Sequence, residues 1–241
     1  VRQALDARAE RLAREGVLPI GLVGRQWQQQ LVDGLVPVRR AWLALGARFP
    51  QPAPKLALGL EFDGIVLDDW IDRLRTDGTH TAWLMQISSK VLDKSGAPRG
   101  DKLIVPWLRQ LAASALGGGV TGYLVARDAV VTMAPIEREE ALVVLGELAA
   151  LWKHNLDAPL PVACKTALAH LAGQDARGVY DGKYELPGEV EQEPCLARLW
   201  PEFALLVAAG GWPDLAHALY GALARWLNEQ IQVTPHAGGE A

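Results

Sequence analysis

Two Asp-Gly pairs constrain the fold of this chain more than any other feature of its sequence. Asp63-Gly64 and Asp77-Gly78 separate three runs of strand-like composition. Asp-Gly is favoured in tight turns between antiparallel strands because Asp tolerates, and Gly readily adopts, a positive φ. The sequence therefore predicts three consecutive strands joined by short turns. They cover residues 55–62, 65–75 and 81–89.

Helical patterns precede these strands. Residues 1–16 carry apolar residues at helical spacing and end at Gly16, which is a suitable C-terminal cap. A second helix is predicted over residues 25–48, and Pro37 is expected to kink or split it. The proline-rich stretch 49–55 then connects the helices to the first strand.

A third helix is predicted after the strands, with Asp101 as its N-cap, Pro106 in its first part and the glycines of residues 117–119 at its end. Two further strands are predicted on either side of Arg127-Asp128. The remainder has helical patterns up to a tail, residues 235–241, that we expect to be frayed.

The order of these patterns indicates an α/β fold in which helices flank a mixed central sheet and a helical extension follows. We expect one compact unit built from three segments. They are N-terminal helices packed on the core (residues 1–50), an α/β core (residues 51–135) and the helical extension (residues 136–241).

Composition and charge fit a globular protein. Of the 241 residues, 50% are hydrophobic and 22% are charged. The net charge is −4, but residues 1–120 carry 16 Lys and Arg against 12 Asp and Glu, whereas residues 121–241 carry 8 against 16. This asymmetry permits a phosphate-facing side and a separate protein-docking side.

The sequence shows no targeting or membrane signal. No apolar run reaches the ~18 residues of a membrane span, and we expect no membrane association. The chain opens on Val1 without a signal-peptide pattern, so we interpret it as a segment of a longer protein. Cys164 and Cys195 form no Cys-x-x-Cys pair and could make one disulfide at most, which favours a reduced, cytoplasmic setting.

The strand at residues 81–89 decides whether the chain could hold a catalytic metal. A two-strand Mg²⁺ site needs an aspartate at the end of one strand and an acid and a lysine at i and i+2 of the next, since alternate side chains share a face. Asp72 fits the first position, but Gln86 and Ser88 occupy the i, i+2 pair. An amide and a hydroxyl hold Mg²⁺ poorly. We therefore expect no catalytic residue, no bound metal and no cofactor, with Asp72 as a relic paired to an arginine such as Arg73 or Arg75.

A basic loop follows the same strand. Lys90, Lys94, Arg99 and Lys102 accompany two acids and could contact DNA phosphates without reading sequence. The alternative is a solvated loop with no ligand.

Other side chains give weaker signals. The nine tryptophans could stack on bases, but Trp27, Trp42, Trp107 and Trp152 lie in helical patterns typical of core or interface positions. The acidic stretch 188–194 is expected to be a solvated loop or a docking segment. The five histidines lack the spacing of a zinc site, and there is no nucleotide-binding or hydrolase motif.

Several segments together resemble a known family. Trp70-Ile-Asp-Arg-Leu followed by a strand is similar to nuclease folds of the restriction-endonuclease-like PD-(D/E)xK type. More specifically, the chain resembles the C-terminal domain of the exodeoxyribonuclease V gamma subunit (RecC). The segments that carry this resemblance are PWLRQLA (106–112) before a Gly-rich turn, LDAPLPVACKTALAHLA (156–172), YDGKYELPGEVEQEPCLARLWP (180–201) and the closing WPDLAHALYGAL.

The resemblance implies a subunit of a bacterial helicase–nuclease that processes DNA double-strand ends for recombinational repair. It implies a nuclease-like domain without cutting residues, which docks the alpha and beta helicase subunits and channels duplex and single-stranded DNA. Two other interpretations stay open. One is an active Mg²⁺ nuclease using Asp72, another carboxylate and Lys90; the other is a protein-interaction domain without DNA contact.

Overall fold

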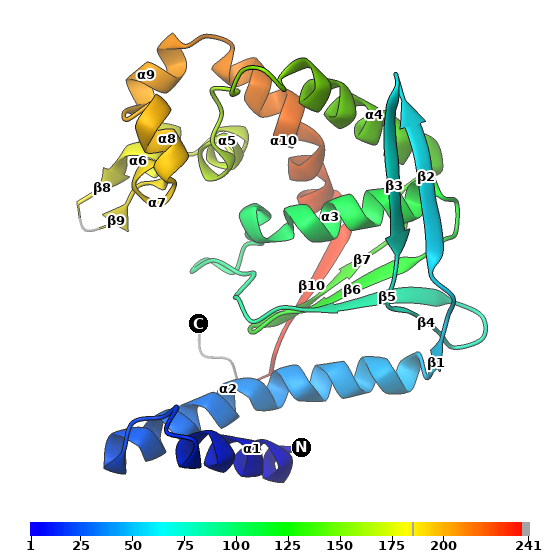
Figure 1. Ribbon diagram of the computed structural model, residues 1–241, viewed down its shortest axis with the longest axis vertical. Coiled ribbons are helices and arrows are strands. Elements are labelled where there is room, and N and C mark those ends of the chain that lie inside the picture. The colour runs from blue at the N-terminus through cyan, green and yellow to red at the C-terminus, as the bar shows by residue number, and fades with distance from the viewer. Residues whose placement is uncertain (185, 238–241) are drawn as a thin grey trace.

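A mixed six-stranded sheet lies between one long helix and a layer of three helices in the computed structural model, which describes residues 1–184 and 186–237 (Figure 1). The strand order is β1-β4-β5-β6-β7-β10. The strands are β1 (Gln51–Pro52), β4 (Leu74–Thr76), β5 (Thr81–Gln86), β6 (Thr121–Val125), β7 (Ala129–Met133) and β10 (Ile231–Pro235). Only β5 and β6 pair in parallel; the other neighbours in this sheet are antiparallel. The predicted α/β fold with a mixed central sheet flanked by helices is confirmed.

Helices cover both faces of the sheet. α2 (Gly21–Arg48) lies along one face, and α3 (Gly100–Ala115), α4 (Arg138–His154) and α10 (Trp212–Glu229) lie over the other (Figure 1). α3 connects the parallel strands β5 and β6, as a crossover helix must when neighbouring strands run in the same direction.

Alternating side chains of β5 serve the two faces. Trp83 packs into the main core beneath α3, where its indole Nε1 donates to Gln110 Oε1 at 2.9 Å. Ala82 and Leu84 join Phe49 and Tyr123 in a smaller cluster on the α2 face. Since both faces are covered, β5 is buried on both sides, which fixes its register.

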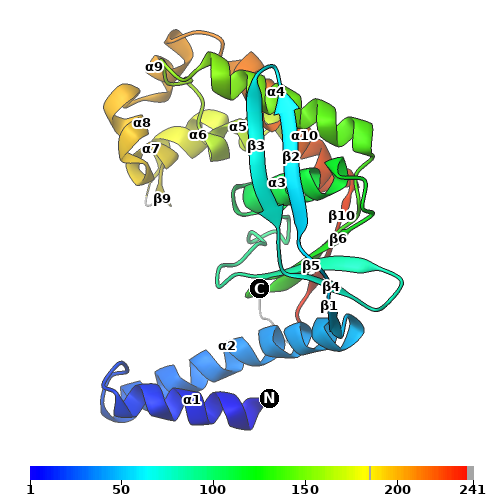
Figure 2. The ribbon, with the colours of Figure 1, turned by 45° about the vertical axis from the view of Figure 1, so that its right-hand side comes forward.

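The hairpin predicted at the first Asp-Gly pair forms a separate ribbon. β2 (Leu56–Phe62) and β3 (Ile65–Ile71) pair in antiparallel register and run past α3 and α4 (Figure 2). Asp63 and Gly64 have φ values of 45° and 78°, as a two-residue turn of this kind requires. Lys153 of α4 donates to the Asp63 carbonyl at 2.6 Å and so holds the hairpin tip against the helix layer.

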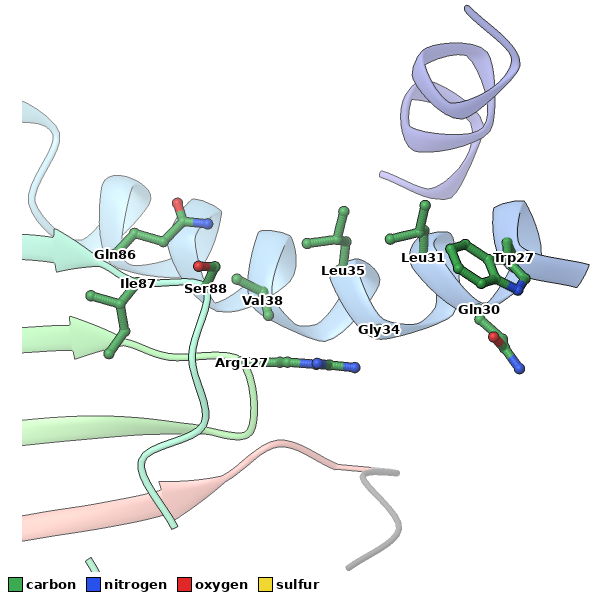
Figure 3. Close-up of a pocket in the computed structure, with 10 residues that line it drawn as sticks. All are labelled: Trp27, Gln30, Leu31, Gly34, Leu35, Val38, Gln86, Ile87, Ser88 and Arg127. Carbon is green, nitrogen blue, oxygen red and sulfur yellow. The ribbon is translucent and has the colours of Figure 1, made fainter. Parts of the chain in front are cut away.

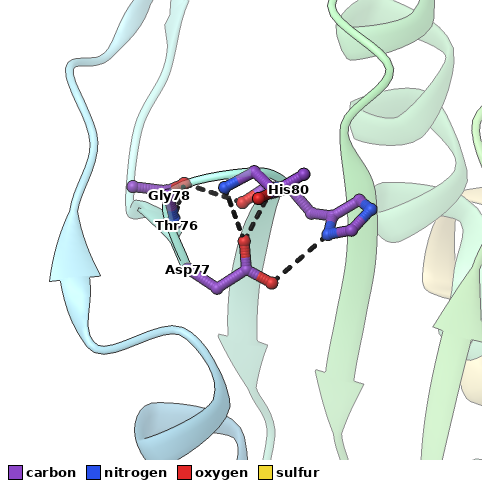
Figure 4. Close-up of polar contacts among 5 residues, drawn as sticks. Thr76, Asp77, Gly78 and His80 are labelled. Atoms are coloured by element: carbon purple, nitrogen blue, oxygen red, sulfur yellow. Dashed lines mark hydrogen bonds and ion pairs between the residues drawn. The ribbon is translucent and has the colours of Figure 1, made fainter.

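The second Asp-Gly pair also forms a turn, between β4 and β5 (Figure 4). The Asp77 carboxylate accepts hydrogen bonds from the backbone N–H groups of Thr79 and His80 at 2.8 and 2.7 Å. These bonds hold the pKa of Asp77 at about 2, with a smaller contribution from the His80 ring. Both predicted turns are therefore confirmed.

The prediction of one strand over residues 65–75 is wrong. The chain breaks after β3, because Arg73 adopts a positive φ of 54° and turns the backbone out of the hairpin and into the central sheet as β4. Strand composition continues through this point, so the sequence pattern did not reveal the break. Asp72 consequently lies at the junction of two sheets rather than at the end of a central strand.

The N-terminal helices form an antiparallel pair. α1 (Arg2–Arg14) packs on α2, which continues through Pro37 as one helix instead of splitting. Val32 and Val36 of α2 meet Ala9 of α1 in a small apolar cluster. α1 therefore supports the part of α2 that extends beyond the sheet (Figure 1).

Two details of α3 differ from prediction. The helix begins at Gly100 with Arg99 as N-cap residue, because the Lys102 N–H already donates to the Arg99 carbonyl at 3.0 Å. Asp101 therefore lies in the first turn and is not the cap. Pro106 lies in the first half of the helix, as predicted, but beyond the first turn, where its missing N–H would be least costly. The predicted glycine end is confirmed.

The C-terminal part of the chain is not wholly helical. Short helices and a two-stranded ribbon precede α10, and β10 then returns to pair with β7 (Figure 1). The tail is anchored as far as the structure describes it, since the His236 N–H donates to the Asp128 carbonyl at 2.9 Å. The frayed-tail prediction is thus wrong for Pro235 and His236, and residues 238–241 lie outside the described residues. The short elements are α5 (Cys164–Leu171), α6 (Ala176–Asp181), β8 (Gly182–Lys183), β9 (Leu186–Pro187), α7 (Glu189–Gln192), α8 (Pro194–Leu199) and α9 (Phe203–Ala208).

The acidic stretch 188–194 is not the solvated loop that its composition predicts. It contains α7, and Glu189 is buried, where its carboxylate accepts from the backbone N–H groups of Lys165 and Thr166 at 2.9 and 2.8 Å. These are N–H groups of the first turn of α5, which have no partner within the helix. Glu189 therefore caps α5 from a neighbouring element.

Among the described helices, none has both the length and the apolar composition that a membrane crossing requires. Both cysteines are free thiols. Burial, followed by the nearby Glu189 charge, raises the pKa of the Cys164 thiol to about 12, so this thiol stays protonated at neutral pH.

Candidate functional site

Asp72, the candidate relic of a metal site, is engaged by an arginine of α3. One Arg109 Nη donates to both the backbone carbonyl and the carboxylate of Asp72 at 2.5 Å. Arg73 approaches the same carboxylate at 3.7 Å. The hydrogen bond from Arg109 is the main cause that lowers the pKa of Asp72. The carboxylate is therefore an anion neutralised by a guanidinium.

The predicted pairing partners of Asp72 are thus partly right. Arg73 contributes a long ion pair, whereas Arg75 donates to the backbone carbonyls of Phe49 and Pro50 at 2.6 Å and anchors the chain that leaves α2. The main partner, Arg109, lies 37 residues away in sequence, and the local pattern around Asp72 contained no signal for it.

Gln86 and Ser88 point to the opposite side of the sheet. Both line a groove against α2, Gln86 from the last position of β5 and Ser88 from just beyond the strand (Figure 3). Asp72 is held on the α3 side, where Arg109 also lies over the Trp83 ring at 5.5 Å. The structure therefore does not bring the three predicted positions together. A cation held at Asp72 would not meet the side chains of Gln86 and Ser88.

Within residues 1–184 and 186–237, no group of three or more His, Cys, Asp and Glu side chains is arranged to hold a metal ion. The expected lack of catalytic residues and metal stays a prediction, because only a functional measurement tests it.

The basic loop between β5 and α3 has a defined backbone. Asp128, from the turn after β6, accepts from the backbone N–H groups of Val91 and Leu92 at 2.9 and 3.0 Å. The Asp93 carboxylate accepts from the N–H groups of Ser95 and Ala97 at 2.8 and 2.9 Å. Asp128 and Asp93 thus organise the backbone of the loop and pair with none of its four cations.

The four predicted DNA-contacting cations differ in their freedom. Arg99 forms an ion pair with Asp101 at 3.0 Å, and Lys102 lies 3.5 Å from the same carboxylate. Lys90 and Lys94 are exposed and have no ion-pair partner within the described part of the chain. If the loop binds phosphates, Lys90 and Lys94 are the cations that are free to do so.

The groove beside Gln86 has a volume of about 670 Å³. One wall is α2, and the other is the end of β5 together with Arg127 from the β6–β7 turn (Figure 3). Sequence reasoning noted Trp27 as a core or interface position but missed the groove. The signal that could have revealed the groove was the run of apolar residues before Val38. These residues lie on the same helix face and continue past the end of the sheet, where the fold does not cover them. The lining residues are Trp27, Gln30, Leu31, Gly34, Leu35, Val38, Gln86, Ile87, Ser88 and Arg127.

The core prediction is confirmed for Trp107 and for Trp42, which packs on the smaller cluster, and an interface role for the other two stays a prediction. Trp107 is buried in the main core, whereas Trp27 and Trp152 are exposed on helix surfaces.

Comparison with known proteins identifies the family. The family model of the RecC C-terminal domain matches residues 1–175. The chain belongs to this family. The match covers the N-terminal helices, the central sheet up to β7 and the segments 106–112 and 156–172 that resembled the family. The resemblance of segments 180–201 and 212–223 lies beyond it and stays a prediction. No curated protein matches the chain.

Proposed function

We propose that this chain is a non-catalytic, nuclease-like domain of the exodeoxyribonuclease V gamma subunit. It acts in the bacterial cytoplasm, in recombinational repair of DNA double-strand breaks. In this proposal its core is a diverged restriction-endonuclease-like fold. It serves as a scaffold for the alpha and beta helicase subunits and as a guide for DNA strands. Membership of the RecC C-terminal domain family supports a place in that complex.

One observation carries the non-catalytic part of the proposal. The carboxylate of Asp72 is held by Arg109, while the neutral side chains of Gln86 and Ser88 face the groove on the other side of the sheet. A metal nuclease needs carboxylates that converge on one cation. Here the acid and the two substituted positions are separated by the sheet itself.

The docking part is tested by reconstitution. The chain, joined to the rest of its gamma subunit, is mixed with purified alpha and beta subunits and examined by size-exclusion chromatography. We expect a stable heterotrimer. If a gamma subunit from which this whole domain has been deleted assembles equally well, the scaffold role is refuted.

The DNA part depends on Lys90 and Lys94. We expect the chain to bind duplex and single-stranded DNA weakly, with an affinity that falls as salt rises, because phosphate contacts release counterions. Lys90→Ala with Lys94→Ala should reduce both the affinity and the slope of its salt dependence. Arg99→Ala, which removes a cation already paired to Asp101, is the matched control and should change them less.

A pure protein-interaction domain is the second candidate, and the exposed groove on α2 favours it. The same titration separates the two. Equal DNA affinity in the wild type and the double lysine variant would show that the loop does not bind DNA. Protein docking would then remain as the proposed function.

A further inference from the structure

The groove lies along an apolar stripe of α2, of which only the C-terminal part packs on the sheet. Trp42 and Leu45 of α2 pack on the sheet face around Phe49, Leu84 and Tyr123. The same stripe continues toward the N-terminus of the helix as Val38, Leu35, Leu31 and Trp27, at spacings of three, four and four residues. Leu35, Leu31 and Trp27 are 44%, 43% and 53% exposed.

The exposed half of the stripe lies on a supported element. α1 packs against the side of α2 that carries Val32 and Val36, so this part of the helix is held without using Leu31 or Leu35. From residue 27 to residue 35 the exposed part of the stripe is about 12 Å long at 1.5 Å per residue, and buried Val38 continues it under the sheet. About two helical turns of apolar surface are thus presented to whatever fills the groove.

The opposing wall gives the groove a shape and a charge. The Ile87 side chain packs on the main core on the other side of the sheet, whereas the Arg127 side chain extends from the β6–β7 turn toward α2 (Figure 3). The Arg127 N–H donates to the Ser89 carbonyl at 3.2 Å, which places the turn beside the start of the basic loop and Lys90. Arg127 and Lys90 are exposed, and neither has an ion-pair partner among residues 1–184 and 186–237.

Gly34 widens the groove at its centre. A Cβ atom added to Gly34 would meet no atom within 4 Å, so the space over this residue is open. A leucine at this position would project into that space. It would also favour the helix, since glycine lowers helix stability by roughly 1 kcal/mol relative to good helix formers.

We propose that this groove receives an amphipathic helix of a partner protein. Apolar residues of that helix, repeating every three or four positions, lie against Leu31 and Leu35, and a carboxylate near one end pairs with Arg127. Such a helix-in-groove arrangement needs an apolar floor and a charged rim, and the groove provides both. The inference rests on the proposed function, which makes the partner one of the two helicase subunits.

A single nucleic-acid strand fits this groove less well. Strand-binding grooves combine repeated cations with several stacking aromatics. The lining here holds one aromatic residue, Trp27, and one cation, Arg127, among aliphatic side chains.

The test measures the affinity of the purified chain for each purified helicase subunit by isothermal titration calorimetry. Leu35→Asp places a charge in the apolar wall, and Gly34→Leu fills the groove. Leu43→Asp is the matched control, because Leu43 lies on the same helix, is also 44% exposed and does not line the groove. Thermal unfolding of each variant shows that it is folded.

We expect both groove variants to weaken binding to one subunit by about tenfold or more, as central interface positions do, while Leu43→Asp stays within about twofold. A photo-crosslinking amino acid in place of Gln30, which also lines the groove, should capture a segment with apolar helical spacing and an acidic residue.

Three results would overturn the inference. Unchanged subunit binding in folded Leu35→Asp and Gly34→Leu would refute the groove as the docking site while leaving the proposed function in place. Failure of the wild-type chain to bind either subunit would contradict the proposed docking function and this inference with it. Loss of binding to an oligothymidylate, or loss of self-association, in Leu35→Asp with subunit binding intact would assign the groove to a different ligand.

Discussion

The structural role of an individual carboxylate in this protein depends on which groups donate hydrogen bonds to it. Asp72 is an ion-pair partner because Arg109 donates to it, and Asp77 is a turn residue because two backbone N–H groups donate to it. The sequence predicts the turn role of Asp77 from its Asp-Gly pair, whereas the ion pair of Asp72 depends on Arg109, which lies 37 residues away. Each assignment leads to a measurable pKa.

At Asp72 we expect the carboxyl group to titrate below its ordinary value of 3.8 in the wild type. Arg109→Ala should raise that pKa, whereas Arg73→Ala, which removes only a long ion pair, should change it less. Carboxyl chemical shifts in a pH titration measure both. Because the pKa is lowered by folding, the stability from this contact is present above the ordinary pKa and is lost as pH falls through the folded value. Identical titrations of Asp72 in all three proteins would contradict the pairing.

At Asp77 we expect a titration midpoint of about 2. His80→Ala removes the ring but keeps the backbone N–H that contributes most, so the pKa should stay well below 3.8. The contribution of Asp77 to stability is therefore complete above 3.8 and is lost between that pH and about 2. A midpoint near 3.8 in the wild type would show that the turn is open in solution.

At the scale of elements, residue patterns located most helices and strands, and the misses have identifiable causes. The Asp-Gly turns follow from local φ preferences, so they were predictable from four residues. The break at Arg73 depends on how two sheets join, and β10 depends on pairing with a strand about 100 residues earlier. Long-range pairing of this kind is not encoded in a local window, because the partner strand determines it.

Close packing at Gly122 of β6 gives a test of the element-scale account. A Cβ at this position would lie 2.3 Å from the Trp83 ring and 2.8 Å from Gln110 Oε1. We expect Gly122→Ala to lower the free energy of unfolding by about 1–3 kcal/mol or more, through overpacking of a buried site. Urea denaturation measures the change.

Gly46 of α2 is the matched control for that substitution. A Cβ there would meet nothing within 4 Å, and the residue lies inside a helix. Gly46→Ala should therefore raise the free energy of unfolding by about 0.5–1 kcal/mol. Equal effects of the two substitutions would contradict the packing described for β6.

The capping of α5 by Glu189 is a second element-scale prediction. Glu189→Ala leaves the N–H groups of Lys165 and Thr166 without their acceptor in a buried site. Each such loss costs about 1–3 kcal/mol, so we expect a clear drop in unfolding free energy. Glu193→Ala, an exposed acid just beyond the same short helix, should have little effect. If the two variants unfold alike, Glu189 does not cap the helix.

At the scale of the whole molecule, the sheet separates the chemistry into two faces. The α3 face holds the Asp72–Arg109 pair, and the α2 face holds Gln86, Ser88 and the groove. The sequence predicted that Gln86 and Ser88 share one face of the strand and occupy the positions of the acid and the lysine, because side chains alternate along a strand. It could not predict that Asp72 would lie on the other face, since that depends on the left-handed turn at Arg73.

The placement of Asp72 and the 86/88 pair on opposite faces predicts a result that the identities of these residues do not predict. If substitution were the only obstacle to metal chemistry, Gln86→Glu with Ser88→Lys would restore an acid-x-Lys pair and with it metal binding. Because Asp72 is held by Arg109 on the other face, we expect the double variant to bind Mn²⁺ no better than the wild type in a calorimetric titration. Metal binding in the double variant that disappears with Asp72→Ala would show that the positions do converge.

The most direct test of the central claim, that this domain is architecture and not a nuclease, is an end-labelled DNA cleavage assay. Duplex and single-stranded substrates are incubated with Mg²⁺ or Mn²⁺ and with the wild-type chain or Asp72→Ala. We predict that neither protein cuts either substrate. Cleavage by the wild type that is lost in Asp72→Ala would contradict the account and assign Asp72 to an active metal site.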